Sequence, residues 1–183
     1  SFIFDCCVEL NNIDGIRNWN TKKLKSFYRS FSYTNLTNLN ALSKWDISKV
    51  EKLDGAFEHI RTLKDINGIS KWNTKKVESI KYLFNYTSIT NTDALKNWNV
   101  SKVTDMEGTF SHTKLKNLNG LKNWNVSKVE NFSNTFSHNK AKDVSGINKW
   151  NIDNGTNFEN VFYKSKVTPK WNGTFNEEGT FIK

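Results

Sequence analysis

Three histidines are the side chains in this sequence best suited to proton transfer or metal binding near neutral pH. Each of His59, His112 and His138 stands two residues after a phenylalanine, where Tyr33 and Tyr86 stand elsewhere in the chain. A catalytic histidine is expected to break a repeated pattern rather than follow it. His112 and His138 could share a metal, but no third ligand is evident. We therefore expect no catalytic residue, no metal site and no cofactor. The five rings form either a half-exposed structural column or a candidate partner-contact column.

Lysines form a second chemically loaded pattern, in a chain whose net charge is +9 and whose pI is about 9.5. One lysine lies four residues after each of five tryptophans: Lys23, Lys49, Lys76, Lys102 and Lys128. Like charges within a Debye length of about 8 Å repel one another, so this row is either solvated or meets an anion. The net positive charge favours an anionic partner and does not choose among nucleic acid, a sulfated or phosphorylated glycan and a membrane surface, and codon bias is an alternative source of the lysines. Nucleic acid is not favoured, because base stacking needs exposed aromatic faces beside the lysines.

Asparagine and aspartate recur in a third pattern, between short apolar runs. Their side chains can bond a sugar or a partner's backbone, or can serve as turn residues that face water. The residues of this candidate strand face are Asn38, Asn40, Asp65, Asn67, Asn91, Asp93, Asn117 and Asn119.

All three patterns are positioned by a repeated unit of about 26 residues. The tryptophans mark this unit, because they recur at spacings of 26, 27, 26, 26, 26 and 21 residues. We expect the first six to form a structural ladder of buried rings: Trp19, Trp45, Trp72, Trp98, Trp124 and Trp150. Trp171 follows them. Each is followed by Asn or Asp, which we interpret as a structural ladder of turn residues. The single 27-residue interval indicates one insertion, between Phe57 and Leu63.

Apolar columns at fixed offsets after each tryptophan predict the local structure. Val50, Leu53 and Phe57 are spaced as one stripe of a helix, and Ser48 with Glu51 matches a capping box. We expect a helix of eight to ten residues in each coil. The second half of each coil has the pattern L-x-x-L-x-G/A-L/I, which favours a very short strand or an extended turn, paired in parallel with its equivalents in neighbouring coils. The predicted fold class is an α/β repeat solenoid of leucine-rich-repeat type, with about six 26-residue coils and a C-terminal cap.

One domain accounts for the chain. Residues 1–18 are expected to form a partial N-terminal coil or cap, 19–171 the repeat solenoid, and 172–183 a hairpin or extended cap. The adjacent Cys6 and Cys7 cannot form a loop-closing disulfide framework, and we interpret them as small apolar fillers rather than reactive thiols. Membrane insertion and a signal peptide are not expected, because no apolar run is long enough and the first residues lack a basic start.

The unit from Trp98 to Phe110, W-N-V-S-K-V-T-D-M-E-G-T-F, resembles the BspA-like leucine-rich repeats of bacterial surface proteins, which are also widespread in mycoplasma surface proteins of uncharacterised function. The resemblance covers about Trp19 to Phe162. Most coils replace its methionine with another apolar residue. The likeness implies surface or secreted localisation and adhesion to host or microbial partners. It supplies no catalytic residue.

These observations predict a non-enzymatic, adhesin-like surface or secreted binding module for a protein or glycan partner. A structural spacer or self-assembling subunit is the alternative, and an anionic-polymer binder acting through the lysine row is the second alternative. The oligomeric state and the identity of the partner stay open.

Overall fold

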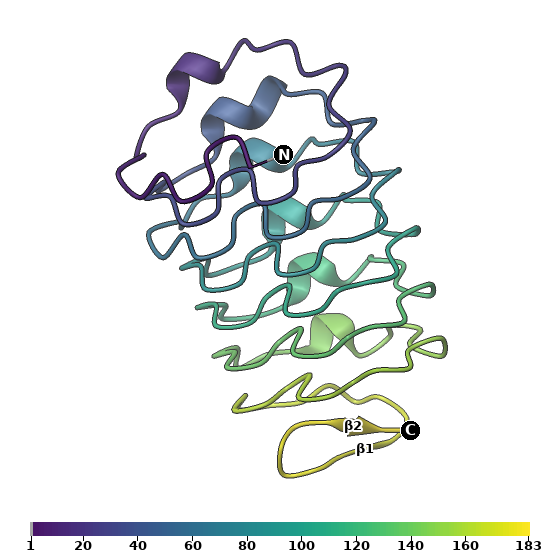
Figure 1. Ribbon diagram of the computed structural model, residues 1–183. Helices are drawn as coiled ribbons and strands as arrows, with labels where there is room; N and C mark the ends of the chain where they lie inside the picture. The colour runs from purple at the N-terminus through teal and green to yellow at the C-terminus, as the bar shows by residue number, and fades with distance from the viewer. Residues whose placement is uncertain (1) are drawn as a thin grey trace.

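The computed structural model describes residues 2–183, which form a stack of coils with the N-terminal coil at one end and a hairpin at the other (Figure 1). Within residues 2–183, six 3-10 turns lie one above another along one side of the stack. They are η1 (Asp14–Ile16), η2 (Asn40–Lys44), η3 (Asn67–Ile69), η4 (Asp93–Leu95), η5 (Asn119–Leu121) and η6 (Ser145–Ile147). Two short strands, β1 (Thr174–Phe175) and β2 (Phe181–Ile182), pair antiparallel in the tail.

The predicted helix after each tryptophan is wrong. Its backbone N–H groups bond the next coil instead of a residue four positions back: Phe31 N donates to Ala56 O at 3.0 Å and Tyr33 N to Glu58 O at 2.9 Å. Parallel bridges join the same segment in successive coils: Ser26 to Lys52, Lys52 to Ser79, Ser79 to Asp105, Asp105 to Asn131, and Asn131 to Asn157. The segment is therefore a ladder between coils.

Two residues of positive φ explain why a helical pattern builds no helix. Leu53, Ala56 and Phe57 are fully buried at a spacing that a helix would also produce. However, Gly55 and His59 both have φ of +59°, and a residue in the left-handed region ends a right-handed turn. The chain instead folds into tight zigzag turns, such as the bond from Ala56 N to Leu53 O at 3.0 Å.

The predicted strand segments are also wrong in most coils, because they contain the 3-10 turns. Parallel bridges occur there only between Asn38 and Asp65 and between Asn117 and Asp143 within residues 2–183. The repeat solenoid is therefore as predicted. Within each coil, however, the predicted helix is the segment that pairs with neighbouring coils, and the predicted extended segment contains the 3-10 turn.

Tryptophan and phenylalanine rings fill the centre of the stack, and each buried indole ties its coil to the previous one. Trp98 Nε1, for example, donates to Ile69 O at 3.0 Å, and Trp124 Nε1 donates to Leu95 O at 2.9 Å. Equivalent bonds hold Trp45, Trp72, Trp150 and Trp171. Trp19 departs from this predicted ladder, since it is 48% exposed and no bond of its Nε1 is found in residues 2–183.

The two ends close the core differently. The N-terminal segment lies along the first full coil, where Phe4 N donates to Ser30 O at 2.9 Å. In the tail, Phe181 of β2 is buried and packs edge-on against Trp171. Cys6 and Cys7 are both exposed free thiols, so their interpretation as buried fillers is wrong.

Candidate binding surface

The structure brings the predicted ring column together as a continuous stack along one edge of the solenoid. Ring centroids of successive members are 4.3, 4.5, 4.0 and 3.9 Å apart, with interplanar angles of 18° or less. The members, from the N-terminal end, are Tyr33, His59, Tyr86, His112 and His138. Because each ring covers its neighbour's face, only the ring edges and their polar atoms face outward.

Every member of the ring column has a left-handed backbone, with φ between 54° and 59°. This conformation is uncommon for residues other than glycine, asparagine, aspartate and histidine. Contacts between stacked rings contribute roughly 0.5–1.5 kcal/mol per pair, which offsets the backbone strain. The column is thus rigid before any partner arrives.

Charges differ between the two halves of the ring column. Near its N-terminal end, guanidinium groups lie over rings: Arg29 is 5.7 Å from the Tyr33 centroid and Arg61 is 5.4 Å from that of Tyr86. Glu58 lies 3.8 Å from both Arg29 and His59. This half therefore mixes both signs of charge.

The histidines of the ring column are held in the neutral form. Burial lowers the pKa of His59, His112 and His138 below the usual value of 6.5. For His112, the neighbouring His138 and His59 and the more distant Lys164 lower the pKa further, and Lys164 does the same for His138. For His59, Glu58 acts in the opposite direction, but burial outweighs it. At neutral pH the imidazoles therefore stack as uncharged rings, each able to donate and accept one hydrogen bond.

Four lysines that the sequence pattern did not predict as a group lie beside the C-terminal half of the ring column. Together with Tyr86, His112 and His138 they line a groove of about 470 Å³. The four are Lys114, Lys140, Lys164 and Lys166, which we call the groove lysines. Lys164 occupies the ring position of its own coil, and the other three lie four residues after the column phenylalanine. That offset was the available signal, but it holds in only three coils.

The predicted lysine row lies elsewhere and is exposed throughout. None of its members forms an ion pair among the residues described. A ladder of acidic and neutral residues runs beside it, in which Glu78 N donates to Glu51 O at 2.8 Å and Thr104 N to Glu78 O at 2.9 Å. The row thus has acidic neighbours that the groove lacks.

Half of the side chains in the predicted Asn/Asp face accept hydrogen bonds from the backbone of their own coil. Asn38, Asp65, Asn91 and Asn117 each accept a hydrogen bond from the N–H two residues on, at 2.8 to 3.1 Å, at the start of a 3-10 turn. The Asn or Asp after each of the first six tryptophans makes an equivalent bond, as Asn99 does with Ser101 N at 3.0 Å. Asn40, Asn67, Asp93 and Asn119 are exposed on the same edge.

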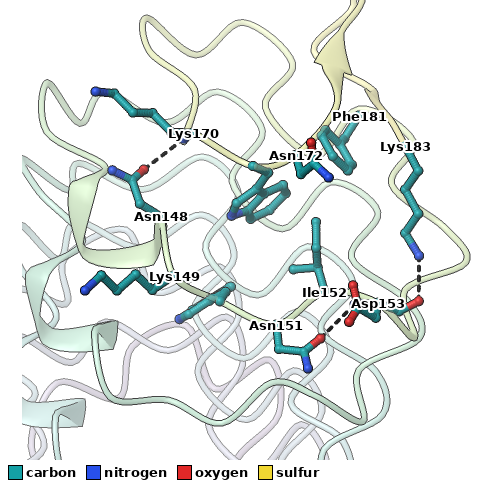
Figure 2. Close-up of a pocket in the computed structure, with 11 residues that line it drawn as sticks. Asn148, Lys149, Asn151, Ile152, Asp153, Lys170, Asn172, Phe181 and Lys183 are labelled. Atoms are coloured by element: carbon teal, nitrogen blue, oxygen red, sulfur yellow. Dashed lines mark hydrogen bonds between the residues drawn. The ribbon is translucent and has the colours of Figure 1, made fainter.

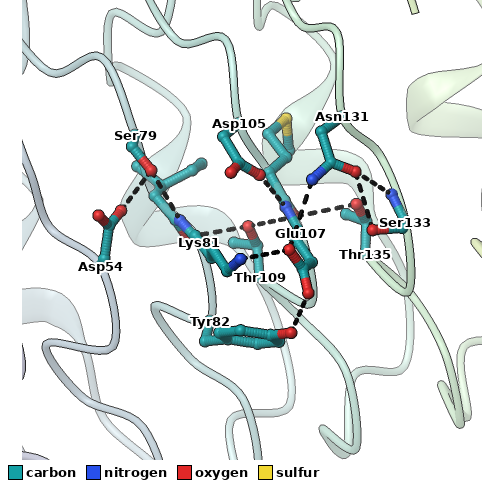
Figure 3. A network of polar contacts seen from close by, with 12 residues as sticks. Asp54, Ser79, Lys81, Tyr82, Asp105, Glu107, Thr109, Asn131, Ser133 and Thr135 are labelled. Atoms are coloured by element: carbon teal, nitrogen blue, oxygen red, sulfur yellow. Dashed lines mark hydrogen bonds and ion pairs between the residues drawn. The ribbon is translucent and has the colours of Figure 1, made fainter. Parts of the chain in front are cut away.

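A polar network that the sequence pattern did not predict joins neighbouring coils (Figure 3). Glu107 accepts hydrogen bonds from Lys81, Tyr82 and Asn131. Burial raises the pKa of Glu107, but the bonds from Lys81 and Tyr82 outweigh it and leave that pKa below its usual value. Burial raises the pKa of the nearby Asp54, which accepts a bond from Ser79. These contacts fix the coils to one another and leave the carboxylate of Glu107 engaged.

A cavity of about 630 Å³ lies where the last coil meets the tail (Figure 2). Trp150, Trp171 and Phe181 line it, and all three are almost fully buried. Lys183 reaches across its rim and donates to Asp153 O and Gly155 O at 2.7 and 2.6 Å. The tail thus covers the apolar end of the stack. We interpret this cavity as a result of how the tail packs on the last coil, and not as a ligand site.

No three metal-ligating side chains come together within residues 2–183. Over the same residues, no helix is both long enough and apolar enough to cross a membrane.

Comparison with known proteins places the fold and the family. A solved internalin of Listeria monocytogenes resembles the chain with a TM-score of 0.58 at 16% sequence identity. The match covers 86% of this chain but 39% of the internalin, so the chain spans about two fifths of that protein. None of the curated proteins compared with the sequence matches it. Residues 1–117 and 87–178 both match one protein family, and the chain therefore belongs to the family described as "Mycoplasma protein of unknown function, DUF285".

Proposed function

We propose that this solenoid is a non-enzymatic binding module for a protein partner, with the ring column as its contact face. One observation carries the proposal: five rings from consecutive coils are stacked in advance, with their edges and polar atoms outward. Aromatic side chains are enriched where proteins contact each other, and a rigid surface loses little conformational entropy on binding. The mixed charges of Arg29, Glu58 and Arg61 supply directional polar contacts at one end.

The finer proposal is an adhesin-like role at the cell surface or in secreted form. It is supported by the likeness to repeats of surface proteins and by the internalin-like fold. A structural spacer or self-assembling subunit is the second candidate, because a regular stack also sets a fixed distance between its two ends.

Binding of the purified chain to an array of extracellular-matrix proteins at two salt concentrations tests the proposal. The variant His59→Ser with Tyr86→Ser removes two ring edges from the centre of the column. Lys49→Ser with Lys102→Ser is the matched control, because it removes two side chains from the lysine row and leaves the ring column intact. We expect one or more proteins to bind in a salt-resistant manner, with affinity lost in the ring variant and kept in the lysine variant. Equal binding by both variants, or no binding to any protein together with concentration-dependent self-association, would refute the proposal in favour of the spacer.

A further inference from the structure

A second binding site follows from the asymmetry of the ring column. Its N-terminal half is flanked by both acidic and basic groups, whereas the groove beside its C-terminal half is lined by four lysines and no acidic side chain. Lys114, Lys140 and Lys166 occupy the same position in three successive coils, and Lys164 lies in the last of these. Neighbouring chains of a parallel ladder are about 4.8 Å apart, so the groove presents roughly one cationic side chain per 5 Å of length.

The groove lysines are accessible to a ligand, and Lys164 Nζ also lies 5.1 Å from the ring centroid of Tyr163. All four are exposed, and none forms an ion pair within residues 2–183. The mutual repulsion of the four ammonium groups raises the energy of the unliganded chain. An anion in the groove would relieve this repulsion.

The floor of the groove carries polar groups suited to hydroxyl and oxyanion ligands. The edges of His112 and His138 supply ring nitrogens. Asn139 also lines the groove and is only 3% exposed. Its Oδ1 accepts a bond from Ala141 N at 2.7 Å, which fixes the amide, while no partner of its Nδ2 is found in the described part of the chain. A buried donor without a partner costs about 1–3 kcal/mol, so an acceptor seated at this position is favoured.

We infer that this groove binds a linear sulfated glycan, with the groove lysines pairing the sulfates and the histidine edges contacting sugar hydroxyls. Sulfated sugars carry a fixed charge on successive rings, which matches a cation on every coil. Nucleic acid fits less well, because the ring faces are covered by one another and no base can stack on them. An acidic peptide also fits less well: side chains on one face of a strand repeat every 6.6 Å or so. Moreover, bidentate carboxylate recognition favours arginine over lysine.

This inference shares His112 and His138 with the ring column of the proposed function, but it depends on the groove lysines and concerns a different class of ligand. The test is titration of the full chain with a heparin octasaccharide at low and physiological salt, beside an unsulfated octasaccharide of the same backbone. We expect the sulfated probe alone to bind, with an affinity that falls as salt rises. The variant Lys114→Gln, Lys140→Gln, Lys166→Gln should weaken binding tenfold or more.

The matched control is Lys49→Gln, Lys76→Gln, Lys102→Gln, which removes the same charge from the lysine row. It should stay within about twofold of the unmodified chain. Imidazole NMR signals of His112 and His138, but not of His59, should shift on saturation with the probe. If both triple variants weaken binding of the sulfated probe equally, binding depends only on the net charge of the chain, and the inference is overturned. Tighter, variant-sensitive binding of single-stranded DNA or of a polyglutamate peptide would overturn it in favour of those ligands.

Discussion

Replacing Gly120 with alanine tests how closely the coils are stacked. A Cβ atom at Gly120 would lie 2.1 Å from Thr92 O and 2.3 Å from Thr92 C, both backbone atoms of the previous coil. An ordinary contact needs about 3.5 Å, so the two coils would have to separate by more than 1 Å. Such a shift stretches the bond from Trp124 Nε1 to Leu95 O, now 2.9 Å, beyond hydrogen-bonding range.

The magnitude follows from the contacts that are lost. Overpacking of a close contact costs about 1–3 kcal/mol, and each lost hydrogen bond accounts for roughly 0.5–1.5 kcal/mol of that. Gly15 provides the matched control, because it occupies the same place in the first coil and a Cβ there meets nothing within 4 Å. Gly15→Ala is expected to leave stability unchanged or to raise it by about 0.4–1 kcal/mol through the unfolded state.

Urea unfolding followed by tryptophan fluorescence measures both variants. Gly120→Ala should lower the free energy of unfolding by about 1–3 kcal/mol relative to Gly15→Ala. Ala41 and Ala94 carry a methyl group at the same repeat position, and each is followed by a glycine in the next coil. Gly120→Ala would place alanines in two consecutive coils. If the two variants unfold at the same urea concentration, the coils are not in the tight contact described, and the reasoning fails.

Three further predictions concern the ring column, the indole ladder and the polar network. Burial lowers the pKa of the three histidines in the folded state, so the unfolded chain binds more protons than the folded chain as the pH falls through 6.5. The contribution of these histidines to stability is therefore full above about pH 7 and declines below it. Urea unfolding at a series of pH values measures this decline. Trp98→Phe removes the donor to Ile69 O and should lower the free energy of unfolding by about 1–2 kcal/mol. Trp19→Phe at the exposed end should lower it by under about 0.5 kcal/mol. Equal losses in the two variants would contradict a stabilising role of the indole bonds. Glu107→Gln weakens the bond to Lys81 and should lower stability by about 1 kcal/mol in low salt and by less in high salt; an effect independent of salt would argue against an electrostatic origin.

Sequence periodicity predicted the stacking of the chain and the residues that meet between coils. The 26-residue spacing of the tryptophans places equivalent residues in register, so the ring column could be assembled from numbering alone. It could not separate the helix from the ladder, because Leu53, Ala56 and Phe57 have the spacing of both. The available signal was Gly55, in the middle of the supposed helical stripe, where glycine weakens a helix by about 1 kcal/mol.

The groove was not predicted, and the reason lies in the same periodicity. Columns present in every coil are easy to find but are mostly needed for stacking, as the bonds of Asn38 and Asn99 show. Lys114 begins a column only halfway along the chain, and Lys164 interrupts the ring column in the coil where that column ends. In a repeat protein, each coil must satisfy the same packing requirements, so a feature confined to a few coils is not required by packing. The groove lysines are such a feature, and their confinement to one end of the ring column is therefore an argument for binding rather than for stability.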